Sequence, residues 1–444
     1  MKTTGFRFAL FLCVIVAAPL SAAPVIETAT FQNGVAGYAG TFDRRISPDT
    51  ADEVDGSTID TEVTSYFIDG GGSALNDEGV QQGLIRFDEI VGAGAVPAGA
   101  KVISATIDIV TGSTSNAQSG GAYNVYRLTT PFDSSSTWAG TFGGDGLAGD
   151  VAEILGSFDD LTQGTPTSAR VEKAVQQWVD GASNLGFGIR SDRTTDGWAP
   201  HTTGAATATL HPQLTVNYTV DPLVSIDSYQ NGVNGYAGTT DIRLNESDGG
   251  TVVGSTVDQT FIDGFSAEGT GSPDQPYFVR FEGLNLNYGE TFKGELVLKG
   301  GFASSAADSG GPFTVHQLLR DWTTDLMYAE LGSDGTPTLN DANELIANGT
   351  IGPAAASTGG HDDTEVIYID VTSIVENWRS GQPNYGFYVG TTETSNGWQI
   401  FTSGADDPSF RPELRIIGVV PEPAAGLMLV AGVLLMVGRL RERR

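Results

Sequence analysis

The chain contains the same unit twice, and this repeat limits what it can fold into. Residues 32–41 read QNGVAGYAGT and residues 230–239 read QNGVNGYAGT. Further short matches follow in the same order and at nearly constant spacing. That spacing is far longer than the roughly 20–50 residues of solenoid repeats. We therefore expect a duplicated domain, with units at 25–220 and 224–418 joined by a short linker.

Apolar and polar residues alternate with a period of two in several segments. Residues 103–109 and 213–220 both show this pattern, which places one side of a strand on a core and the other in water. The 59 Gly and 19 Pro among 444 residues favour short strands and turns over a helical bundle. Helical spacing indicates one short helix per repeat, at 171–179 and 371–379. The predicted fold class is all-β, with two tandem antiparallel β-sandwiches that each carry one short helix.

The N-terminus has the pattern of a secretory signal peptide over residues 1–23. A basic start precedes an apolar run at 8–18 and a small-residue cleavage site at 21–23. An uncleaved helical anchor is the alternative, although this run is short for a bilayer, which needs about 20 residues. Cys13 is the one cysteine. Removal of the segment would therefore leave a protein without thiol chemistry or disulfides.

The C-terminus, residues 420–444, combines three features in order. They are a Pro421-Glu422-Pro423 motif, an uncharged apolar segment at 424–438 and an Arg-rich end. The segment predicts a single transmembrane helix, with the basic end in the cytoplasm by the positive-inside rule. The tail resembles the PEP-CTERM sorting signal. The resemblance implies recognition by an exosortase, cleavage near the motif and delivery to the bacterial cell surface or extracellular matrix. A lasting membrane anchor is the alternative.

The charge balance excludes one class of partner. The chain has 23 Lys and Arg against 54 Asp and Glu, a net charge of −31. Nucleic-acid binding depends on cationic side chains that neutralise phosphates, so no nucleic-acid partner is expected. The four His form no recurring motif, and no nucleophile elbow, zinc pair or phosphate loop is present. We expect a protein that is not an enzyme and that has no cofactor except a possible structural Ca²⁺.

An ordered set of motifs occurs in both repeats. In the first repeat the set runs QNGVAGYAGTFDRR at 32–45, IRFD at 85–88, a helix that ends in Trp178, GW at 197–198 and PQLTVNY at 212–218. This set resembles the DNRLRE domain, a family related to disaggregatase repeats and to certain carbohydrate-binding modules. The resemblance implies a jelly-roll sandwich in each repeat and a role in binding exopolysaccharide or another glycan.

Aromatic side chains are the first candidates for a glycan site, because sugar rings stack on exposed aromatic plates. Trp198 and Trp398 follow turn residues that would expose them. Packing under a loop is the alternative for both. The other aromatic candidates occupy matching positions in the two repeats: Tyr38 and Tyr236, and Trp138 and Tyr328.

Two further pairs are candidates for charged ligands. Arg86 and Arg280 alternate with apolar strand residues, so each could reach an open sheet face and clamp a uronic-acid carboxylate. The alternative is a structural ion pair, with Asp69 or Asp263 as the acid. Asp43 and Asp241 follow Gly-Thr steps and could bind Ca²⁺; turn capping is the alternative for them.

Three hypotheses of function follow from the sequence. The first is a non-enzymatic protein of the surface or matrix that binds polysaccharide with one module per repeat, so that two weak sites gain avidity. The second is a structural scaffold of a biofilm or surface that contacts other proteins. The third is a cryptic polysaccharide hydrolase or lyase with a pair of carboxylates.

Overall fold

The computed structural model describes residues 24–49, 54–55, 65–70, 80–113, 122–159, 161–191, 197–245, 250–264, 274–301, 311–331, 341–361, 364–391 and 397–420. The predicted signal peptide at 1–23 lies outside these residues, as do Pro421, Glu422, Pro423 and the predicted span at 424–438. Among the described residues, no helix is both long and apolar enough to cross a membrane.

The first repeat forms two antiparallel sheets. One has the strand order β1-β10-β5-β8 and the other the order β3-β2-β4-β9-β6-β7. The bounds are β1 Glu27–Gln32, β2 Thr41–Ile46, β3 Val54–Asp55, β4 Gln82–Phe87, β5 Lys101–Val110, β6 Tyr123–Leu128, β7 Val151–Phe158, β8 Pro166–Arg170, β9 Phe187–Arg190 and β10 Gln213–Thr219.

The second repeat has the same two sheets, ordered β11-β22-β16-β19 and β13-β12-β15-β20-β17-β18, and an additional pair β14-β21. The bounds are β11 Val224–Gln230, β12 Thr239–Leu244, β13 Thr251–Val253, β14 Gln259–Ile262, β15 Tyr277–Phe281, β16 Glu290–Lys299, β17 Phe313–Leu318, β18 Ile351–Thr358, β19 Val366–Asp370, β20 Phe387–Thr391, β21 Trp398–Phe401 and β22 Glu413–Val419. The prediction of an all-β chain with antiparallel sheets is confirmed.

Each core lies between the two sheets of its repeat. In the first repeat Ile107 and Leu214 of the four-stranded sheet share one buried cluster with Ile85 and Phe187 of the six-stranded sheet. The second repeat has the equivalent cluster between its own sheets. The period-two segments therefore bury their apolar side, as the alternation predicts.

The two predicted helices are present as α1, Glu172–Val179, and α3, Thr372–Arg379. Each packs on the four-stranded sheet of its own repeat, through β5 or β16. Trp178 and Trp378 are both 4 % exposed, and each lies 4.9 Å, ring to ring, from a Phe of the six-stranded sheet. A third helix, α2 (Asp341–Ala347), occurs in the second repeat.

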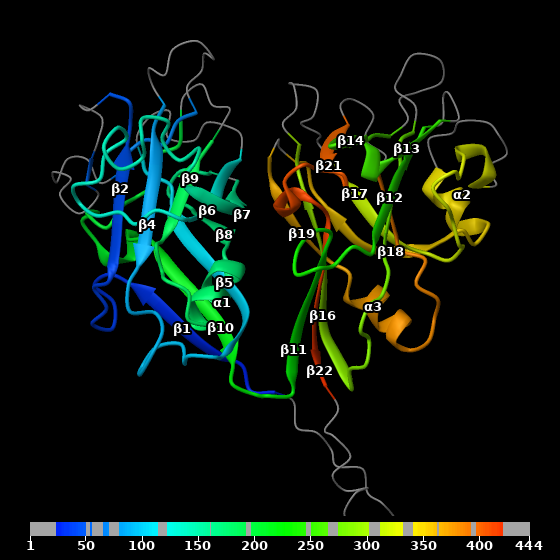
Figure 1. Cartoon of the computed structure of the whole chain (residues 1–444), viewed down its shortest axis with the longest axis horizontal. Coiled ribbons are helices and arrows are strands. Elements are labelled where there is room, and N and C mark those ends of the chain that lie inside the picture. Colours follow the sequence, from blue (N-terminus) through cyan, green and yellow to red (C-terminus); the bar gives the residue numbers. More distant parts are fainter. Residues whose placement is uncertain are drawn as a thin grey trace, which may run out of the picture.

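The two repeats lie side by side (Figure 1). In the described residues no strand ladder crosses from one repeat to the other, and the sheets divide at the linker around residues 220–224. The outer face of β22, β16 and β19 packs instead against β7, α1 and the start of β5 through side chains. We call this contact the junction.

Candidate functional site

The two tryptophans chosen from the sequence as exposed plates are buried, so that prediction is wrong. Trp198 and Trp398 both have 0 % exposed surface. A bridge between Ile68 and Trp198 draws the first ring into the core, where it packs on Tyr123 and Phe158 at 5.3 and 4.9 Å. Because neither ring has exposed surface, a sugar cannot reach either of them.

The surroundings of the second tryptophan are similar. Trp398 pairs with Ile262 in the β14-β21 ladder, and its ring lies 5.3 Å from Phe313 and 4.5 Å from His361. Its indole is therefore part of the core that this strand pairing closes.

The remaining aromatic candidates also have structural partners. The hydroxyl groups of Tyr38 and Tyr236 donate to the carbonyls of Asp88 and Glu282 at 2.9 and 3.0 Å. Burial raises the pKa of both, that of Tyr236 to about 12. Each Tyr therefore ties a glycine-rich loop to the end of a strand.

Trp138 and Tyr328 do not form an exposed platform, so that expectation is also wrong. They are only 8 % and 6 % exposed. Trp138 Nε1 donates to the carbonyl of Gly144 at 2.9 Å, and Tyr328 donates to Asp274 at 3.4 Å. Both rings fill small clusters beneath surface loops.

The two arginines are already held by carboxylates of this chain. Arg86 Nε lies 2.7 Å from Asp88 Oδ1, and its guanidinium also donates to the carbonyl of Phe132. Arg280 contacts Asp321 at 2.7 Å and lies over a Trp ring. These contacts match the ion-pair alternative, but the acids are Asp88, Asp321 and Glu282 rather than the expected Asp69 and Asp263. A uronate would have to displace them.

Asp43 and Asp241 are 1 % exposed and accept hydrogen bonds from loops 160 and 162 residues away in the sequence. Thr203 donates to Asp43 through its backbone N–H at 3.1 Å and through its hydroxyl. Ser403 does the same for Asp241. Burial raises the pKa of Asp43 to about 6, against the lowering effect of the Thr203 hydrogen bonds.

These carboxylates therefore pin one strand of each repeat to a distant loop. No group of three acidic, His or Cys side chains in the described part of the chain is placed to hold a metal. A Ca²⁺ site at Asp43 or Asp241 stays a prediction.

The junction carries a buried network of charges that sequence reasoning missed. Arg170 of the first repeat contacts Glu295 of the second, with Nη1 to Oε1 at 2.5 Å and Nη2 to Oε2 at 3.1 Å. Arg415 lies 3.0 Å from the same Glu295 and 3.7 Å from Glu172 across the junction. Burial alone would raise the pKa of Glu295, but the hydrogen bond and charge of Arg170, with Arg415, lower it to about 2. Glu295 therefore stays ionised between two guanidinium groups.

Further side-chain contacts connect the two repeats at the junction. Lys173 of α1 pairs with Glu413 of β22. Tyr368 donates to the carbonyl of Leu155 at 2.7 Å, and Ser157 accepts the backbone N–H of Val366 at 3.0 Å. Edge strands β7 and β19 thus satisfy each other's polar groups, which leaves neither edge open to another chain at these points.

A comparison of the repeats could have revealed the junction. The strand registers of the two repeats identify four pairs of equivalent positions. The first repeat has Thr106, Gln213, Thr215 and Ser168 there; the second has, in the same order, the junction residues Glu295, Glu413, Arg415 and Tyr368. These four positions are uncharged and exposed or half-buried in the first repeat, whereas in the second repeat three of them carry a charge and are buried in the junction. This difference between equivalent positions of the two repeats is the feature of the sequence that could have indicated the junction.

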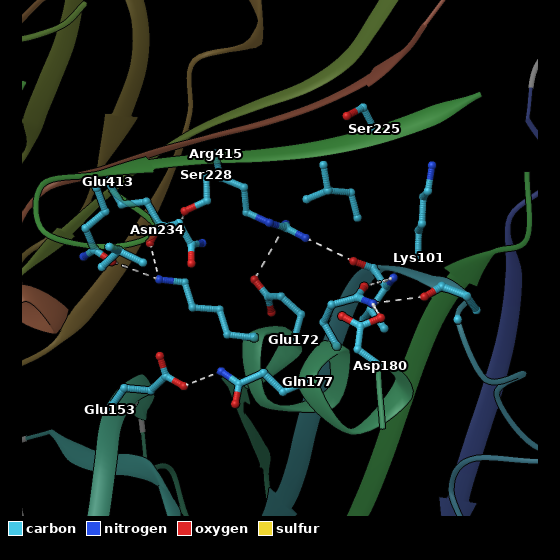
Figure 2. A pocket seen from close by; sticks show the side chains of 18 residues that line it. Lys101, Glu153, Glu172, Gln177, Asp180, Ser225, Ser228, Asn234, Glu413 and Arg415 are labelled. Atoms are coloured by element: carbon cyan, nitrogen blue, oxygen red, sulfur yellow. Dashed lines mark hydrogen bonds and ion pairs between the residues drawn. The ribbon is translucent and has the colours of Figure 1, made fainter. Parts of the chain in front are cut away.

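A polar cleft opens beside the junction (Figure 2). Its volume is about 540 Å³, within the range of small-molecule sites. Glu172, Gln177 and Asp180 line it from the α1 side, and Ser228 and Asn234 line it from β11 and the loop that follows. Both repeats therefore contribute hydrogen-bonding groups to one cleft.

Comparisons with known proteins assign no family. No protein-family model and no curated protein matches the chain. Among solved structures, an allantoicase structure is 8 % identical, with 76 % of this chain and 77 % of that one covered and a TM-score of 0.17. The VP2 subviral particle of infectious bursal disease virus is 12 % identical, with 90 % and 77 % covered and a TM-score of 0.13. Neither similarity bears on the fold or function of this chain.

Proposed function

We propose that this chain is an exported, non-enzymatic protein of a bacterial surface or extracellular matrix that binds polysaccharide. The observation that carries the proposal is the cleft between the repeats. Its lining combines carboxylates, the amides of Gln177 and Asn234 and the hydroxyl of Ser228. Such groups suit the hydroxyl rim of sugars. Export rests on the signal-like N-terminus and on the tail that resembles a PEP-CTERM signal, with an exosortase as the partner during secretion.

We further infer that each repeat is a jelly roll. The order β1-β10-β5-β8 against β4-β9-β6-β7 supports this, because consecutive strands from β4 to β9 change sheets at every step except the antiparallel pair β6-β7. The order β11-β22-β16-β19 against β15-β20-β17-β18 follows the same path. The additional strands β2 and β3, or β12 and β13, extend one edge.

Affinity electrophoresis tests the proposal. The secreted protein is run through gels that contain neutral polymers (β-glucan, xylan, mannan) or acidic ones (alginate, polygalacturonate). Retardation by at least one polymer is expected. Free mobility in all of them, together with self-association in sedimentation, would favour a scaffold that contacts proteins. Release of reducing ends or unsaturated products would favour a hydrolase or lyase instead.

A further inference from the structure

We infer that the chain has one polysaccharide site, at the junction, rather than one site per repeat, and that this site takes an uncharged glycan segment. The inference rests on the proposed function and deepens it. Three observations support it. The cleft is formed by surfaces of both repeats, the charged groups that line it are already paired, and one residue differs between two otherwise identical loops.

The cleft requires surfaces from different repeats. Helix α1 supplies one wall, and β11 with the loop at 231–236 supplies the other. The equivalent elements, α3 and β1, lie in different repeats, and α1 and β11 lie between them in the view of Figure 1. Lys173 of α1, which reaches Glu413 across the junction, has Ser373 as its counterpart in α3. Duplication of the fold therefore does not duplicate this cleft.

The cationic groups of the lining are already engaged. Lys173 pairs with Glu413, and Arg415 lies between Glu295 and Glu172. The Lys101 ammonium donates to the carbonyls of Pro222, at 3.2 Å, and of Val224. A carboxylate on the ligand would have to break one of these pairs.

The acidic groups of the lining also favour an uncharged glycan. Glu153 accepts from Arg127 at 3.1 Å and from Gln177 at 2.9 Å, and Asp180 accepts from Gln176 at 3.0 Å. The whole chain also carries a net charge of −31, which repels polyanions. Fixed acceptors, amides and hydroxyls are suited to a neutral sugar.

Asn234 is the residue that distinguishes the two loops. The loops at 32–41 and 230–239 differ only in Ala36 and Asn234. Both residues have a positive φ, 51° and 50°, so an Ala already occupies this backbone conformation in the first repeat. Asn234 is exposed and lines the cleft. Replacement of Asn234 by Ala therefore reproduces a loop that this chain already folds.

The test uses titration calorimetry on the full secreted chain. The probes are hexasaccharides of the neutral polymers named above, with hexagalacturonate as the acidic probe. We expect one neutral hexasaccharide per chain and an affinity that changes little between 20 mM and 500 mM NaCl. Asn234→Ala should weaken binding about fivefold to tenfold, the size of one net hydrogen bond. The matched control, Ala36→Asn, should leave the affinity unchanged.

The outcomes separate the inference from the proposed function. Two neutral hexasaccharides per chain, equal effects of Asn234→Ala and Ala36→Asn, or salt-sensitive binding of hexagalacturonate alone would overturn the junction site and leave polysaccharide binding standing. Absence of retardation by every polymer in the gels would overturn both. Circular dichroism of each variant checks that the sheets are intact.

Discussion

Arg170 and Glu295 form a two-point ion pair that joins one repeat to the other. Their closest atoms lie 2.5 Å apart, and the Arg170 guanidinium also lies 3.8 Å from the centre of the Tyr368 ring. The Glu295 side chain is 4 % exposed and that of Arg170 is 18 % exposed. A pair this well covered, with Arg415 on its other side, is sensitive to the loss of one member.

Glu295→Gln should therefore destabilise the chain by about 3 kcal/mol, because Arg170 and Arg415 would lose one of the two carboxylates that they share and would keep Glu172. Denaturant unfolding at pH 7 measures this. The matched control is Thr106→Ala at the equivalent position on the open face, which should change stability by no more than about 0.5 kcal/mol. Equal effects of the two variants would show that the contacts of Glu295 contribute nothing measurable to stability.

Lys299→Val should remove a pH dependence of stability. Lys299 is 2 % exposed and its ammonium donates to the carbonyl of Ser409. Burial, with the nearby charge of Lys173, lowers the pKa of Lys299 to about 7, although Glu413 opposes the shift. Because the unfolded chain then holds its proton more tightly than the folded chain, stability should rise as pH increases above 7.

The measurement is the denaturant midpoint between pH 6.5 and 9, compared for the wild type and the variant. Val110 occupies the equivalent place in the first repeat, so valine is compatible with this strand position. If the denaturant midpoint of Lys299→Val rises with pH as much as that of the wild type, another group causes the pH dependence of stability.

Asp43→Asn should remove a pH dependence of the opposite sign. Burial raises the pKa of Asp43 from 3.8 to about 6. The folded chain therefore holds this proton more tightly than the unfolded chain, and the contribution to stability falls as pH rises from about 4 to 6. Thermal melts across this range should show a smaller decline in the variant than in the wild type. An unchanged decline would mean that Asp43 is not the group that titrates.

The two buried tryptophans should respond differently to replacement by Phe. Trp198 Nε1 donates to Thr111 at 3.0 Å, whereas Trp398 Nε1 has no hydrogen-bond partner among the described residues. Trp198→Phe should therefore cost about 1 kcal/mol more than Trp398→Phe, because it leaves the buried Thr111 hydroxyl without its donor. Chemical denaturation of both variants checks this. A larger loss for Trp398→Phe would contradict the assignment.

Several features could be predicted from the sequence because they depend on local periodicity. Alternation along residues 103–109 is sufficient to identify a strand with one buried side, and the spacing around Trp178 is sufficient to identify a helix. The repeat itself is visible in the sequence, and the sheets divide where the repeat does. Each of these features depends on residues close together in the chain or on a direct comparison of the two halves.

Other features were decided only by the tertiary structure. The Gly before Trp198 indicates a turn but not its direction, and the bridge to Ile68 turned the ring inward. The partner Asp321 of Arg280, 41 residues away, also depended on which loop lies beside that arginine. The junction and its cleft depend on how two complete sandwiches pack. Local propensities and strand periodicity carry no information about that packing, because it depends on contacts such as Arg170 to Glu295, 125 residues apart.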